Sequence, residues 1–414
     1  MKQASARPDV APTASRAGSP WPTVLRGAAA LAAAMGVGRF AYTPIMPLMH
    51  AQAGMPESLG ASLATANYVG YLAGALLGIA APALLRSTAV LRTGLLVLAA
   101  SLASMPLTHN GGTWWTLRLV AGAASALVFM ISTSAMLAGL AAHAEHLTGW
   151  AFGGVGAGIA LSGVTVLAAQ QAGSWHTAWS ACAALAVLLT AAAWNLSPRG
   201  AAPAAPAAPA APAAPAAPAA PAAPAAAERP RTHRWFAALL ASYLLEGVGY
   251  IIAGTFLVAA LQQGAPGWIG SGAWIVVGLA ALPSCALWMR LARHVSRPAL
   301  LTISLSLQAV GIALPALSGG NVPALAAAVL FGATFMGVST MALAIGTHLR
   351  IPRAIALLTT GYSLGQILGP LLAAPLLHNG YHSALLLGAA LVLAAACAAA
   401  VCCIRFPHHL TRTA

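Results

Sequence analysis

Charged residues are scarce in this chain of 414 residues, and acidic ones are the scarcest. Asp and Glu together number 5 against 19 Lys and Arg, and charged residues make up 6% of the sequence. A soluble domain carries about 25% charged residues, so this composition excludes an ordinary soluble protein. With 60% apolar residues and a mean hydropathy of +0.82, the chain is typical of an integral membrane protein.

Motifs of enzymes and of disulfide scaffolds are also missing. The sequence has no nucleotide-binding P-loop, no zinc-type ligand spacing, and no Ser or Cys nucleophile motif with a polar partner in an aqueous domain. The five cysteines lie in or at the ends of apolar runs, without disulfide spacing. Cys402, Cys403, His408 and His409 could bind a metal at the mouth of the last helix, but apolar filler and a solvated tail are favoured. We therefore predict a chain that is not an enzyme and that holds no cofactor or metal.

Twelve apolar runs can be separated by turn and charge signals. Most reach the roughly 20 residues that a helix needs to cross a bilayer. The first follows a polar stretch and is too long for the core of a signal peptide, so no cleaved signal is expected. The sequence predicts an all-α membrane protein with spans at 24–49, 59–85, 93–108, 115–140, 150–171, 176–196, 235–261, 269–289, 299–317, 323–346, 354–377 and 383–404.

The distribution of the positive charges indicates a membrane topology rather than nucleic-acid binding. The net charge is +14, and 17 of the 19 Lys and Arg fall in segments that can all be placed on one side. That asymmetry is the positive-inside pattern. It predicts a multi-pass protein of the bacterial inner membrane with both termini cytoplasmic. One predicted inner loop, around His143 to His146, carries no Lys or Arg and is assigned by count alone.

A low-complexity segment divides the chain. Ala201 to Pro224 is an Ala-Ala-Pro triplet repeated eight times. Proline at every third position forbids a continuous α-helix and favours polyproline II, which could extend about 75 Å at about 3.1 Å per residue. We interpret it as a spacer, with a ligand for a proline-binding partner as the alternative.

The two parts of the chain repeat each other. Gly36-Val37-Gly38 recurs as Gly247-Val248-Gly249 after 211 positions, and Gly122-Ala123 recurs as Gly332-Ala333 after 210. The segment 148–153 recurs at 360–365. Near-constant offsets favour duplicated six-helix halves, the plan of many secondary transporters; shared packing glycines without duplication are the alternative. The expected domains are a cytoplasmic N-terminus 1–22, a first bundle 23–198, a cytoplasmic linker 199–234, a second bundle 235–404 and a tail 405–414.

Two ionisable residues stand deep inside apolar runs. Arg39 lies near the middle of the first run, in GVGRFAYTPIMPLM, and Glu246 is the one carboxylate inside any run. Burying a guanidinium there costs about 2.5–3.5 kcal/mol on insertion scales, so such a charge marks a functional site or is held by backbone carbonyls. The repeat offset places Glu246 at a depth similar to that of Arg39. The two could pair, directly or through water, across a cavity; a fixed ion pair that sets packing is the alternative.

Arg118 lies near the outer end of the fourth run. Its side chain could snorkel to the interface beside Trp114 and Trp115, or turn inward as a second cation. Arg39, Arg118 and Glu246 give the membrane interior a formal charge of +1, which favours anionic or carboxylate-bearing solutes.

These motifs resemble the major facilitator superfamily, and its YbfB/YjiJ-type branch in particular. GVGRFAYTPIMPLM, ATANYVGYLAGALLG, GWAFGGVGAGIALSG and GYIIAGTFL carry the resemblance. It implies that spans one, four, seven and ten line a cavity, and that Arg118 with Gly122 matches a fourth-helix motif linked to proton coupling. Gly361, Gly365, Gly369 and Pro370 resemble an antiporter motif that normally lies in span five. The basic loop between spans two and three lacks the usual Asp.

Together these observations predict a secondary transporter that is proton-coupled, exports a sugar, drug or organic acid, and works as a monomer in the lipid bilayer. A sensor with such a cavity but no transport is the alternative. The expected substrate contacts are Arg39, Tyr42, Asn67, Tyr71, Tyr250 and Tyr362. Proton coupling is expected at Glu246, Arg118 and Arg39. Helix packing and gating are expected at Gly153, Gly156, Gly361, Gly365, Gly369 and Pro370.

Overall fold

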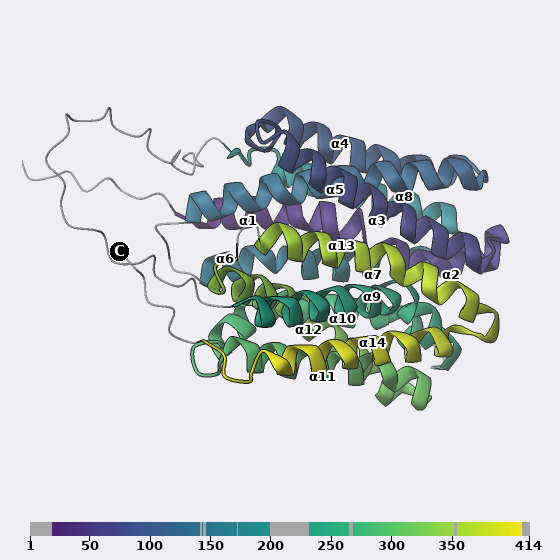
Figure 1. Ribbon diagram of the computed structural model, residues 1–414. Coiled ribbons are helices and arrows are strands. Elements are labelled where there is room, and N and C mark those ends of the chain that lie inside the picture. Colours follow the sequence, from purple (N-terminus) through teal and green to yellow (C-terminus); the bar gives the residue numbers. More distant parts are fainter. Residues whose placement is uncertain are drawn as a thin grey trace, which may run out of the picture.

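The computed structural model describes residues 19–140, 143, 146–171, 173–198, 232–264, 268–351 and 354–407. Within these residues the regular secondary structure is entirely helical (Figure 1). The Ala-Pro spacer, most of the N-terminus and most of the tail, including His408 and His409, lie outside the described residues. The predictions made for those segments therefore stay predictions.

The first half of the chain supplies the helices before the spacer. They are α1 (Trp21–Leu31), the π-helix η1 (Ala32–Val37), α2 (Tyr42–Ala53), α3 (Glu57–Ala80), α4 (Thr88–Ser104), α5 (Gly111–Leu140), α6 (His146–Phe152), α7 (Gly154–Gln171) and α8 (Trp175–Ala193). The 3₁₀ turns η2 (Leu84–Arg86) and η3 (Met105–Leu107) flank α4.

The second half has longer and more continuous helices. They are α9 (His233–Gly264), α10 (Trp268–Leu291), α11 (Arg297–Leu317), α12 (Asn321–His348), α13 (Ala354–Ala373), the 3₁₀ segment η5 (Ala374–Asn379) and α14 (Tyr381–Val401).

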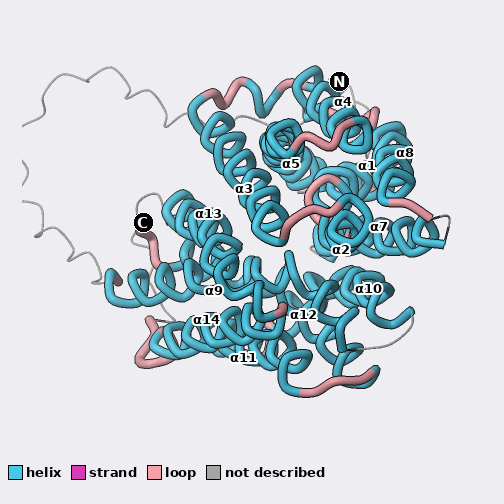
Figure 2. The backbone as a smooth tube through the Cα atoms, turned by 90° about the vertical axis from the view of Figure 1, so that its right-hand side faces the viewer, coloured by secondary structure: helices cyan, strands magenta, loops and turns pink. Residues whose placement is uncertain are grey.

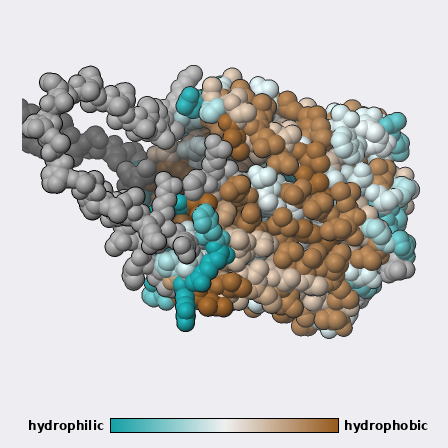
Figure 3. Space-filling view, in the orientation of Figure 1, coloured by the Kyte–Doolittle hydropathy of each residue, from teal (hydrophilic) through white to brown (hydrophobic). Residues whose placement is uncertain are grey.

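Membrane-spanning helices account for the predicted runs. Eleven helical segments of the described chain are long and apolar enough to cross a membrane, and α1, η1 and α2 together form the first, Trp21–Ala53. The 20-residue α13 occupies the place of the remaining predicted span, 354–377. Hydrophobic residues cover much of the middle of the face shown in Figure 3. Exposed large apolar side chains of the molecule include Leu76, Leu96, Val164, Leu188, Leu279, Leu307 and Leu393. The predicted all-helical membrane fold is confirmed.

The helices gather into two groups, α1 to α8 and α9 to α14 (Figure 2). The groups meet where α7 packs on α10 and where α3 packs on α13. At the first contact the backbones touch, because a methyl group added at Gly156 would overlap the backbone of Gly278 and Leu282. Small residues of this kind let membrane helices approach closely.

Repeated glycines make equivalent contacts in the two halves. A methyl group at Gly122 of α5 would overlap the backbone of Asn67 in α3, and one at Gly332 of α12 would overlap the backbone of Val277 in α10. Thus the fourth helix of each half packs on the second through the same repeated position. This equivalence supports duplicated halves over shared glycine motifs.

The arginines mark one end of the bundle. The described chain begins and ends on the same side of the molecule, at the left in Figure 1. Nine arginines lie at or near helix ends on this side, which is called the basic end below. They are Arg26, Arg86, Arg92, Arg234, Arg290, Arg293, Arg297, Arg350 and Arg405.

Candidate substrate and coupling site

The first membrane span is broken at its centre. After α1 the chain forms the π-helix η1, with Gly38 N bonded to Ala33 O at 2.8 Å, and then a turn over residues 38–41 before α2. Pro44 and Pro47 in α2 have no N–H to donate and so weaken the regular helical pattern there. Gly36 allows the break to lie directly on the backbone of Gly158 in α7. Such π segments inside helices are frequent at functional sites.

Arg118 of α5 holds this break in place. Its guanidinium donates from Nη1 to Gly38 O and from Nη2 to Arg39 O, each at 3.2 Å. The side chain is 2% exposed, and its guanidinium carbon lies 4.8 Å from the centre of the Tyr42 ring. Of the two orientations considered for Arg118, the structure shows the inward one. The guanidinium supplies donors to two buried carbonyls that the broken helix leaves without intrahelical partners.

Arg39 projects from the break to the junction of the two halves. Its Nη2 donates to Gln366 Oε1 of α13 at 2.7 Å. Its guanidinium carbon lies 4.4 Å from the ring centre of Tyr71, 5.0 Å from that of Tyr68 and 5.4 Å from that of Phe40. These are cation–π distances. The side chain is 3% exposed, and its Nε has no hydrogen-bond partner. Arg39 is thus a buried cation that retains a free donor.

A stack of aromatic rings faces this cation from the second half. Tyr250 of α9 stacks at 5.7 Å on both Phe331 and Phe335 of α12 and at 6.0 Å on Tyr362 of α13. Tyr362 stacks in turn on Tyr243 at 4.4 Å. Two residues predicted to contact the substrate, Tyr250 and Tyr362, therefore belong to one set of nearly parallel rings.

The other two predicted contacts have partners inside the first half. Asn67 of α3 is fully buried and donates from Nδ2 to Arg118 O at 3.0 Å. Tyr42 donates to Gly60 O at 2.8 Å and stacks on Trp179 at 6.4 Å. In this state both residues join helices of the first half, although Asn67 Oδ1 has no hydrogen-bond partner.

Glu246 has no hydrogen bond to Arg39. Its side chain is fully buried, and both carboxylate oxygens have no hydrogen-bond partner. The polar side chain that influences the Glu246 carboxyl group is Gln308 of α11, inside the second half. The positions of the two side chains do not satisfy the geometry of a hydrogen bond. Within the described residues no ion pair joins Glu246 to Arg39, whose Nη2 is bonded to Gln366. The structure therefore does not form the predicted pair.

The end of the molecule opposite the basic end is closed by contacts between the halves. Thr43 Oγ1 of α2 donates to Gly254 O of α9. The Tyr68 hydroxyl of α3 is hydrogen-bonded to Thr255 Oγ1 at 3.1 Å. Farther out, Glu57 at the start of α3 lies against Tyr381 at the start of α14.

Toward the basic end the residues around Arg39 are more open. Tyr71, one turn beyond Tyr68 along α3, is partly exposed, and so is Tyr362 of α13. Tyr68 and Tyr250 are 5% and 3% exposed. Exposure around Arg39 therefore increases toward the basic end.

The predicted packing glycines fall into two groups. Gly153 and Gly156 lie on α10 of the other half. Gly365 and Gly369 of α13 lie on the backbone of α9 within their own half, and Pro370 lies inside α13. Gly361 approaches only side chains of α9, at Leu240 and Leu244.

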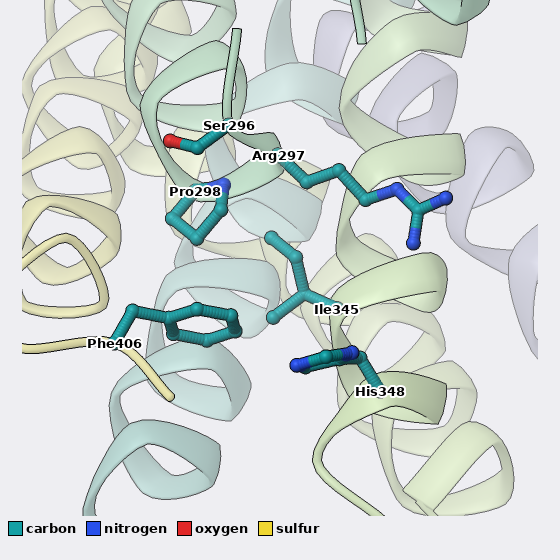
Figure 4. A pocket seen from close by; sticks show the side chains of 6 residues that line it. All are labelled: Ser296, Arg297, Pro298, Ile345, His348 and Phe406. Carbon is teal, nitrogen blue, oxygen red and sulfur yellow. The ribbon is translucent and has the colours of Figure 1, made fainter. Parts of the chain in front are cut away.

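A separate pocket lies at the basic end of the second half (Figure 4). It has a volume of about 180 Å³ and is lined by Ser296, Arg297, Pro298, Ile345, His348 and Phe406. His348 bonds to Pro407 O at 2.8 Å and stacks on Phe406. Since all its lining residues belong to one half, this pocket is not the site between the halves.

Two helical halves around a buried ionisable residue are typical of secondary transporters. The chain belongs to the family described as uncharacterised MFS-type transporter YbfB, whose model matches residues 31–400. The predicted family is confirmed. The protein is therefore a multi-pass membrane transporter of a small molecule, and not an enzyme.

Solved structures show the same fold at low sequence identity. A mutant of the nucleoside transporter NupG is 15% identical, with a TM-score of 0.68 over 92% of this chain and 99% of that chain. Another NupG structure is also 15% identical, with a TM-score of 0.65 over 92% and 98%. A comparison with curated proteins found no match. This likeness establishes the fold alone.

Proposed function

We propose that the protein is a proton-coupled transporter that exports a small organic anion across the bacterial inner membrane. The proposal of an anionic substrate is based on Arg39. It is a permanent cation, buried between the halves, with an unpartnered Nε and a hydrogen bond to Gln366 that a ligand can replace. A carboxylate matches the fork of a guanidinium, whereas a neutral sugar or drug would leave the charge uncompensated.

The nearby rings favour a flat substrate. Tyr71 and Tyr362 are partly exposed beside Arg39, and Tyr362 continues into the aromatic stack of the second half. A planar group that carries a carboxylate could lie against these rings while its charge meets Arg39.

The placement of the arginines supports the proposed direction of transport. The basic end faces the cytoplasm under the positive-inside rule. The partly exposed residues around Arg39 lie toward that end, and the opposite end is closed by Thr43, Tyr68 and their partners. A substrate would enter from the cytoplasm and leave after the two halves rock, as in alternating access.

Glu246 is proposed to carry the coupled proton. It is a fully buried carboxyl group without a cation partner in the described structure. Such a group stays in an apolar interior when it is neutral, and releases its proton when water or a cation reaches it. Arg118 positions Arg39 by binding the carbonyls of the broken helix, and is proposed to bias this release.

Ligand-induced thermal shifts identify the substrate first. The detergent-purified protein is screened against organic acids, sugars and drugs, and we expect a planar carboxylate to raise the melting temperature. Arg39→Ala should abolish that shift, and Arg39→Lys should reduce it, because a lysine cannot make the bidentate contact. Shifts only from neutral sugars, unchanged in Arg39→Ala, would contradict an anion site.

Proton flux in liposomes then tests coupling. With the ligand so identified, substrate addition should drive proton movement through the wild type, and Glu246→Gln should abolish it. Ligand binding without any flux in the wild type would instead indicate a sensor. Undiminished coupling in both Glu246→Gln and Arg39→Ala would remove these assignments.

A further inference from the structure

Two polar side chains meet in the apolar interior of the second half. Glu246 of α9 and Gln308 of α11 are both fully buried. Both oxygens of the carboxyl group and both polar atoms of the amide have no hydrogen-bond partner, although Gln308 lies close enough to Glu246 to influence its carboxyl group. Native proteins leave few buried polar atoms unpaired, and each such atom calls for an explanation.

No cation compensates the carboxyl group within the described residues. The titratable groups within electrostatic range of Glu246 include Tyr243 and Tyr250 on its own helix and Tyr362 on α13. The basic side chains of the other helices of this half lie at helix ends, namely Arg290 of α10, Arg297 of α11, His348 of α12 and His382 of α14. An ionised carboxylate here would be a buried charge without a partner, which is strongly unfavourable.

A carboxylic acid and a carboxamide are complementary hydrogen-bonding groups. The acid O–H can donate to Gln308 Oε1, while Gln308 Nε2 donates to the carbonyl oxygen of the acid. This arrangement would satisfy all four atoms. A carboxylate can accept from Nε2 but leaves Gln308 Oε1 without a donor. We propose that Glu246 is protonated in this state and that Gln308 is the amide that holds the acid, so that the two form the proton site of the second half.

The proposed proton site joins α9 to α11 within the second half, and α9 also contacts the first half. On the same helix as Glu246, Gly254 and Thr255 close the opposite end against Thr43 and Tyr68. Loss of the proton to water transfers one proton and leaves the carboxylate, and the complementary bonding to α11 is lost. Release therefore favours movement of α9 relative to α11. As a coupling step this rests on the proposed function, whereas the acid–amide pairing does not.

Infrared difference spectroscopy observes the protonated acid directly. The wild-type protein in lipid should show the carbonyl stretch of a protonated, hydrogen-bonded carboxyl group, and Glu246→Gln should lose that band. Gln308→Leu should keep the band but shift it to the higher frequency of an acid without a hydrogen bond. Ser304→Ala is the matched control, because Ser304 is also buried on α11 but is bonded to Leu301 O of its own helix.

Two outcomes would overturn the pairing. If Glu246→Gln removes no such band, the carboxyl group is ionised; if Gln308→Leu leaves the band in place, the amide is not its partner. Gln308→Met, which keeps a long side chain, replaces Gln308→Leu if the latter fails to fold.

Transport separates this inference from the proposed function. In liposomes Gln308→Leu should lower the turnover several-fold with an unchanged KM, because the altered residue acts through Glu246 and not on the substrate. A Gln308→Leu protein with a shifted band, together with intact proton coupling in Glu246→Gln, would support the pairing and refute the coupling role. Lost coupling in Glu246→Gln with an unshifted band in Gln308→Leu would do the reverse.

Discussion

Removing the guanidinium of Arg118 should destabilise the protein measurably. Arg118→Ala leaves the carbonyls of Gly38 and Arg39 buried without their donors. Each orphaned group costs about 1–3 kcal/mol, and the lost contact with Tyr42 costs about 0.5–2 kcal/mol. Relief of the buried charge offsets part of this sum, so we expect a net loss of about 3 kcal/mol.

Thermal unfolding in detergent measures this loss. A change of that size corresponds to a decrease in the melting temperature of about 5 °C, given that larger chains shift less per kcal/mol. Arg118→Lys should lie between Arg118→Ala and the wild type, because an ammonium is a point charge and does not reproduce the planar fork. Arg293→Ala, which removes an exposed arginine at the basic end, is the control and should change the melting temperature little. Equal melting temperatures for Arg118→Ala and Arg293→Ala would refute the role assigned to Arg118.

Two further predictions concern packing and the spacer. Gly122→Ala should destabilise the protein by about 1–3 kcal/mol through overpacking, because the added methyl group overlaps the backbone of Asn67. Gly264→Ala, which has open space around it, is the control and should be nearly neutral in the same melting assay. Similar effects of the two changes would argue against a rigid contact between α3 and α5. Deletion of Ala201 to Pro224 should leave liposome transport nearly intact, because an Ala-Pro repeat forms no core, and a large loss would mean that the spacer binds a partner.

Hydropathy and repeat offsets predicted the fold well because both are determined by the order of residue types along the chain. The helical spans follow from the length of apolar runs. The offset of about 210 positions placed Gly122 and Gly332 in equivalent contacts. Arg39 lies midway along the first span, Trp21–Ala53, as its position in the apolar run predicted.

The orientation of side chains around the helices could not be predicted in the same way. Arg39 lies in a broken segment, whereas Glu246 lies in an uninterrupted helix of 32 residues. A constant offset therefore predicts the depth of a residue in the second half from its counterpart in the first half. It does not predict the direction in which the side chain points. For this reason the sequence suggested an Arg39–Glu246 pair, and the structure shows Arg39 at Gln366 and Glu246 near Gln308.

Gln308 and Gln366 were not among the predicted site residues, although the sequence does contain a signal for them. Gln308 and Gln366 lie within predicted spans 299–317 and 354–377, where an amide side chain is costly unless it has a partner. The break in the first span was harder to predict, because its alanines and glycines fit an apolar helix as well as a π segment. The partners of Arg118 are backbone carbonyls, which no residue pattern identifies.

We propose that Arg39 occupies a site between the halves that is reached from the cytoplasmic side. Cysteine accessibility measures this most directly in a background without the five native cysteines. Tyr71→Cys and Tyr362→Cys should react with a membrane-impermeant maleimide in inverted vesicles and not in right-side-out vesicles, and Tyr68→Cys should react in neither. Labelling of Tyr71→Cys from the outer side alone, or of neither cysteine from either side, would contradict cytoplasmic access to Arg39.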